Sequence, residues 1–180
     1  MNLNDLIEEI EEFYPDYEVE VYENEDLKPG QVAVGGFFTP DPFAPSIEIA
    51  LQVSASCEDP YEEEIVNDIS KLQEEIYVTV MHEERHWNQF QSQLNNGYFL
   101  DGLRAHLDES RESYLGDKDE MDAFSTCDLA RFVELNGWAS AFSSKYSILS
   151  DYINVFGKNS PITKKIIKKA YKSLNCEGYA

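Results

Sequence analysis

The residues best suited to chemistry lie in the segment His82-Glu83-Glu84-Arg85-His86. Two histidines four positions apart lie on one face of a helix, with their Cβ atoms about 5–6 Å apart. Two imidazoles at this spacing can bind one zinc ion, and a glutamate beside the first can accept a proton from a water that the metal activates. The pattern therefore predicts Zn²⁺ as the cofactor, His82 and His86 as its ligands and Glu83 as the catalytic base.

A catalytic zinc site needs a third protein ligand and keeps a fourth position open for water. His106, the remaining histidine, is one candidate, and Glu120 is another. Ala123, Cys127 and Ala130 follow Glu120 at helical spacing, as a stripe of small residues. Such a stripe would allow the helix of Glu120 to approach another helix closely, which makes Glu120 the better candidate.

The order of these features resembles that of the gluzincin class of zinc metallopeptidases, particularly its minimal members. The common features are a helix, a small sheet, a His-Glu-x-x-His helix and a later helix with Glu-x-x-Ala, here residues 120–123. Residues 47–53, 82–89 and 114–123 are also similar to segments of small phage-encoded metallopeptidase-like proteins. The resemblance implies a hydrolase that cleaves peptide bonds with water activated by zinc.

Carried over residue by residue, the resemblance implies that His82, His86 and Glu120 bind zinc and that Glu83 is the general base. Glu84 and Arg85 depart from the class, in which the two residues between the motif halves are usually uncharged.

Three further residues are candidates for supporting roles. Asp122 could orient one of the histidine ligands through a hydrogen bond. Tyr114 or His106 could stabilise the oxyanion of a tetrahedral intermediate.

Hydrophobic periodicity predicts the elements that must position these residues. The expected elements are a helix at 3–13, strands at 17–22, 31–38 and 47–53, and helices at 62–94, 103–106, 117–133, 138–155 and 162–174. The predicted fold class is α+β and zincin-like. It has an N-terminal helix, a small three-stranded sheet of antiparallel type, an active-site helix and a helical C-terminal half.

One zincin-like domain is expected over residues 1–180. Its parts are a helix and small sheet in 1–56, the metal-site helices in 60–136 and the C-terminal helices in 138–180. The resemblance to this class implies that a peptide or protein substrate pairs with strand 47–53, by adding a strand to the sheet edge.

The chain is strongly acidic, with 14 Lys and Arg against 35 Asp and Glu, a formal net charge of −21. Such a surface repels phosphate, so nucleic acid is not an expected partner. No apolar run is long enough for a membrane span, and the N-terminus does not read as a secretory signal. Three scattered cysteines favour a reducing compartment, so we expect the protein in the cytoplasm, or in the host cytoplasm if it is viral.

The basic residues concentrate near the C-terminus, on the last expected helix. Its lysines are expected to pair with the protein's own acidic surface or with an acidic partner, while an apolar stripe anchors the helix. The stripe comprises Ile162, Ile166, Ala170 and Leu174.

Two alternatives to the peptidase stay open, and a third is disfavoured. The chain could be a catalytically silent zinc-binding protein of the same fold that acts through partner binding. It could be a metal-free acidic interaction protein in which the motif is accidental. A di-iron helical bundle would use Glu83-x-x-His86, but it needs a second Glu-x-x-His, which the sequence lacks.

Overall fold

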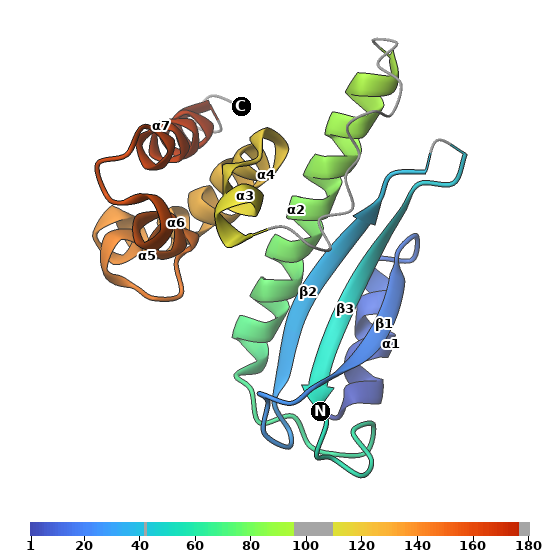
Figure 1. Ribbon diagram of the computed structural model, residues 1–180. Helices are drawn as coiled ribbons and strands as arrows, with labels where there is room; N and C mark the ends of the chain where they lie inside the picture. Colours follow the sequence, from blue (N-terminus) through green and yellow to red (C-terminus); the bar gives the residue numbers. More distant parts are fainter. Residues whose placement is uncertain (42, 96–109, 177–180) are drawn as a thin grey trace. The chain divides into compact units, whose positions relative to one another are not determined.

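A computed structural model describes residues 1–41, 43–95 and 110–176 (Figure 1). The chain forms two compact units, Met1–Trp87 and Asn88–Ala180. Helix α2, Ile69–Asn95, runs through the boundary between them. The fold class is α+β, as predicted, whereas the single domain stays a prediction. Among the described helices, none is both long and apolar enough to cross a membrane.

The first unit begins with helix α1, Leu3–Phe13, which confirms the helix expected there. The Asn2 side chain accepts a hydrogen bond from the Asp5 amide, and the Asp5 side chain accepts one from the Asn2 amide. This reciprocal capping satisfies two amide groups that have no partner within the helix, so it fixes where α1 begins.

The three expected strands are present as β1 (Glu18–Asn24), β2 (Val32–Thr39) and β3 (Ser46–Ser54). Their order is β1-β3-β2, with β1 parallel and β2 antiparallel to β3. The sheet is therefore mixed, and the prediction of an antiparallel-type sheet is wrong. The physical reason is that β3 inserts between β1 and β2, so the first two strands are not a hairpin pair.

This strand order also corrects the expected substrate strand. Strand β3 is central, and its backbone groups bond to β1 along one edge and to β2 along the other. A substrate peptide cannot add to a strand whose two edges are already paired, so the prediction for residues 47–53 is wrong. Among the described strands, the outer edges of the sheet belong to β1 and β2.

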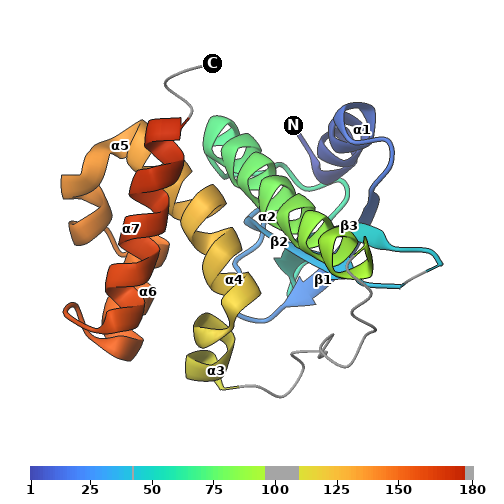
Figure 2. The ribbon, with the colours of Figure 1, turned by 90° about the horizontal axis from the view of Figure 1, so that it is seen from above.

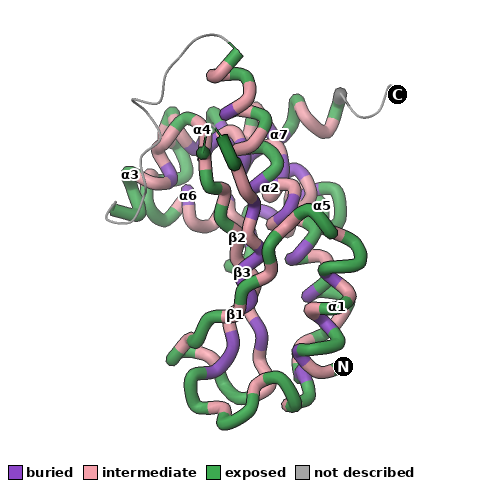
Figure 3. Tube along the Cα trace, turned by 90° about the vertical axis from the view of Figure 1, so that its right-hand side faces the viewer, coloured by how far each residue is buried: buried purple, intermediate pink, exposed green. Residues whose placement is uncertain are grey.

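One face of the sheet packs against α1 and the first half of α2, which lie on the same side of it (Figures 1 and 2). Side chains alternate across a strand, so every second residue of β3 faces this core. Figure 3 marks the buried residues along α1 and β3. The fully or nearly fully buried members of the core include Leu3, Leu6, Ile49, Leu51, Leu72 and Ile76.

Helix α2 begins seven residues later than the predicted start at Glu62. Ile65 fits the helical pattern and is buried, but its amide donates to the Met1 carbonyl at 3.0 Å. The neighbouring Glu64 forms a β-bridge with Asn2. These contacts hold the segment extended against the start of α1, so the helix cannot begin there.

The second unit is helical. It contains the second part of α2, α3 (Arg111–Gly116), α4 (Lys118–Ala123), the π-helical turn η1 (Phe124–Leu129), α5 (Ala130–Ser143), α6 (Ile148–Phe156) and α7 (Pro161–Cys176). The helix expected over 117–133 is therefore widened by a π turn. The helix expected over 138–155 is broken before Ser147, which caps α6. The expected short helix at 103–106 lies outside the described residues.

Helix α7 confirms the predicted anchoring by an apolar stripe. Ser160 accepts a hydrogen bond from the Thr163 amide and caps the helix. Ile166 and Ala170 are fully buried in the core of the second unit. Of the α7 lysines, Lys169 forms an ion pair within the described part of the chain, and its partner is Asp122.

Candidate metal centre

Helix α2 holds the two motif histidines side by side, because they are one helical turn apart. The ring centroids of His82 and His86 are 4.9 Å apart, with an angle of 63° between the ring planes. His82 is only 6% exposed, and His86 is half-buried. The pair can present two imidazole nitrogens to one metal ion, as the spacing predicts.

Glu83 is buried beside strand β2, against Gly36. A Cβ atom at Gly36 would lie 2.8 Å from Glu83 Cγ, 3.0 Å from Glu83 Oε1 and 2.7 Å from Thr79 Cγ2. Only glycine therefore lets this turn of α2 approach β2 so closely. Gly36 was not assigned to the site from the sequence, although a glycine at an inward-facing strand position was the available signal.

Two aromatic side chains continue the contact between β2 and α2. Phe38 is on the same face of β2 as Gly36, and Trp87 follows His86 in α2. The ring centroids of Phe38 and Trp87 are 5.9 Å apart, and both side chains are half-buried. Gly36 and Phe38 thus both lie on the side of β2 that faces α2.

Glu84 and Arg85, the two charged residues between Glu83 and His86, are exposed. Tyr17 Oη donates a hydrogen bond of 2.7 Å to Glu84 Oε1. Burial, followed by this hydrogen bond and the Glu84 charge, raises the pKa of the Tyr17 hydroxyl. The charges of Glu84 and Arg85 can therefore be accommodated at the surface, while His82 and Glu83 are buried.

Glu120 lies in the second unit, in the first turn of α4. Asp117 caps this helix, since its Oδ1 accepts hydrogen bonds from the amides of Asp119 (2.7 Å) and Glu120 (3.2 Å). Glu120 is only 6% exposed. A buried carboxylate is costly unless a hydrogen bond, a cation or a metal compensates it, so the position suits a ligand.

The predicted stripe of small residues below Glu120 is buried. Ala123 is fully buried, and Cys127 and Ala130 are each 6% exposed. The stripe continues through η1, where the wider turn changes the helical spacing on which the sequence argument depended.

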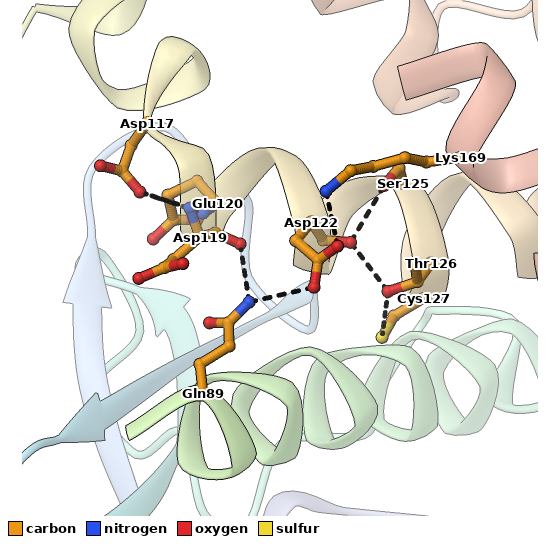
Figure 4. A network of polar contacts seen from close by, with 9 residues as sticks. All are labelled: Gln89, Asp117, Asp119, Glu120, Asp122, Ser125, Thr126, Cys127 and Lys169. Carbon is orange, nitrogen blue, oxygen red and sulfur yellow. Dashed lines mark hydrogen bonds and ion pairs between the residues drawn. The ribbon is translucent and has the colours of Figure 1, made fainter. Parts of the chain in front are cut away.

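Asp122 contacts neighbours from two other helices (Figure 4). Its Oδ1 accepts from Lys169 Nζ at 2.6 Å, and its Oδ2 accepts from Gln89 Nε2 at 3.3 Å. The role predicted from the sequence, orienting a histidine, stays a prediction. Pairing of the last helix's lysines with the protein's own acidic surface was expected, but no sequence pattern marks Asp122 as the partner of Lys169 or of Gln89.

The other two candidates receive no direct support. Tyr114 packs edge-on against Phe124, with ring centroids 5.8 Å apart, and the Arg111 guanidinium lies over its ring. These contacts place Tyr114 at the border of the apolar core of the second unit, and its role in catalysis stays a prediction. His106 lies outside the described residues.

Known proteins do not identify a family for this chain. Comparison with protein-family models, with curated proteins and with solved structures gave no match. Its function is therefore inferred from its own residues: the histidine pair, the buried Glu83 and the capped, buried Glu120.

Proposed function

We propose that the chain is a zinc-dependent metallopeptidase. His82, His86 and Glu120 bind the metal, and Glu83 is the general base. The observation that carries the proposal is the paired imidazoles of α2 with a buried glutamate next to the first of them. Histidine and glutamate side chains are not commonly buried without a partner or a function.

The donor set fits zinc. Of the described residues, His82, His86 and Glu120 are the group that could hold a metal ion, and each offers one ligand atom. Two imidazoles and one carboxylate are a common ligand set of catalytic zinc sites, and three protein ligands leave a fourth position open.

The contacts of α2 support Glu120 as the third ligand. His82, His86, Gln89 and Gln93 follow one another at spacings of four, three and four residues, so they share one face of the helix. Gln89 Nε2 donates to the Asp119 carbonyl at 3.2 Å, and Gln93 Nε2 donates to Asp119 Oδ2 at 3.2 Å. The residue before Glu120 is thus held against the part of α2 that belongs to the second unit.

Zinc, when bound, supplies a Lewis acid that polarises a carbonyl group and makes water a better nucleophile. Glu83 accepts the proton of the attacking water and passes it to the leaving amine. Gly36 leaves the space in which the Glu83 carboxylate lies, and Asp117 fixes the backbone of Glu120 by capping α4.

An extended substrate would pair with β2 instead of β3. Strand β2 lies at an edge of the sheet, and its inward face carries Gly36 against Glu83. A peptide added to this edge would receive main-chain hydrogen bonds close to the general base.

The proposal is tested with protein purified without an affinity tag. Fluorescently labelled, unfolded casein is the substrate, and zinc content is measured in the same samples. Glu83→Gln should keep zinc and lose hydrolysis, because an amide cannot accept the proton. Glu84→Gln is the matched control, since it removes a neighbouring exposed carboxylate, and it should keep both.

The outcomes separate the alternatives. Zinc without hydrolysis in the parent protein would favour the catalytically silent zinc protein. A parent protein that binds no zinc would favour the metal-free interaction protein. Equal hydrolysis by the parent and Glu83→Gln would refute the proposed role of Glu83.

A further inference from the structure

Asp122 is held through both its carboxylate and its backbone carbonyl. Lys169 and Gln89 donate to the two carboxylate oxygens at 2.6 and 3.3 Å. The hydroxyls of Ser125 and Thr126 donate to the Asp122 carbonyl at 3.0 and 2.8 Å. These hydroxyls bond at the place where α4 widens into the π turn η1, so they fix the end of α4 (Figure 4).

Glu120 lies between two residues that are anchored in this way. On one side, Asp119 accepts hydrogen bonds from Gln89 and Gln93 of α2. On the other side, Asp122 is bound to Gln89 and to Lys169 of α7. Because one glutamine reaches both neighbours, a shift of α4 along α2 would break both hydrogen bonds.

Lys169 also compensates charge. The turn that carries Glu120 contains Asp117, Asp119 and Asp122 as well, and like charges this close repel one another. The Lys169–Asp122 pair is only partly exposed, with 30% and 20% of the two side chains accessible, so solvent screens it incompletely.

We propose that Lys169 is a positioning residue for Glu120, acting through Asp122, and that Gln89 fixes the same turn from the α2 side. Lys169 touches neither metal nor substrate. It holds the helix turn from which Glu120 reaches the metal, and it therefore raises metal affinity. This inference rests on the proposed function, because it takes Glu120 as a ligand.

The test is a competitive zinc titration against a chelating dye at neutral pH. Lys169→Met keeps the length of the side chain and removes its charge, and it should weaken zinc binding about tenfold, the lower end for residues that orient a ligand. Lys169→Arg should restore affinity to within about threefold. Lys168→Met, on the exposed side of the same helix, is the matched control and should bind like the parent.

A double-mutant cycle separates positioning from a general effect on folding. If Lys169 acts through Glu120, then Lys169→Met should change zinc affinity less than about twofold in a Glu120→Gln background. If Lys169→Met lowers zinc affinity by the same factor in the parent protein and in the Glu120→Gln variant, the inference is overturned. If Lys169→Met does not fold, Asp122→Asn takes its place, with the same tenfold expectation.

The two proposals fail in different ways. Parent-like affinity in Lys169→Met or Asp122→Asn, together with strong loss in Glu120→Ala, would overturn the positioning role alone. A parent protein that binds no zinc would overturn both the positioning role and the proposed function.

Discussion

Gly36→Ala should destabilise the protein and displace the Glu83 side chain, the proposed general base. The added Cβ would lie 2.7 Å from Thr79 Cγ2 and 2.8 Å from Glu83 Cγ, where carbon atoms normally stay at least about 3.4 Å apart. Both neighbours belong to one turn of α2, which packs against the sheet, so the helix or the strand must shift. Overpacking of this kind costs about 1–3 kcal/mol of unfolding free energy.

Gly35→Ala is the matched control. Its Cβ would meet Gln52 Nε2 at 3.7 Å and the Ala50 Cβ at 3.9 Å, which are ordinary contacts. Neither Gly35 nor Gly36 has a positive φ, so alanine is compatible with both backbones. At position 35 alanine should be neutral or should stabilise by about 0.4–1 kcal/mol, because it restricts the unfolded chain.

The assay is urea unfolding followed by circular dichroism at neutral pH, with hydrolysis measured on the same samples. Gly36→Ala should unfold at lower urea than Gly35→Ala and should hydrolyse less. Equal unfolding midpoints and equal hydrolysis for the two variants would refute the close packing of Glu83 on Gly36.

Two tyrosines give further predictions. The pKa of Tyr17 is higher in the folded protein than in the unfolded chain, where it is about 10. The hydrogen bond of Tyr17 to Glu84 therefore contributes its full stability below about pH 10, and this contribution falls as the pH rises further. Tyr17→Phe should therefore cost about 0.5–1.5 kcal/mol at pH 7 in urea unfolding, and a difference that does not shrink above pH 10 would contradict this. Tyr152 is fully buried, and its hydroxyl has no hydrogen-bond partner among the described residues. Tyr152→Phe should then raise the melting temperature, by an amount equivalent to about 1 kcal/mol, and a lowered value would show that the hydroxyl is satisfied.

Sequence patterns were enough to predict the elements that depend on residues close together in the chain. The apolar spacing and the cap at Asn2 define α1, and the alternation in Ile47–Val53 defines a strand with a buried face. The spacing of His82 and His86 likewise predicts paired imidazoles, which the structure contains. Each of these features depends on residues that are close in the sequence.

The features that could not be predicted depend on distant partners. The position of β3 between β1 and β2 is set by pairing between segments separated by a third strand. Ile65 fits a helical pattern, yet a bond to the Met1 carbonyl keeps its backbone extended. The ion pair between Asp122 and Lys169 joins residues 47 positions apart, and many exposed lysines of α7 could have been its donor.

The most direct test of the central claim is the zinc content of the tag-free protein after dialysis, measured by mass spectrometry of the metal. We predict one zinc ion per chain in the parent protein and none in a variant that combines His82→Ala and His86→Ala. A parent protein without zinc, or a double variant with the same zinc content as the parent, would contradict the proposed metal centre.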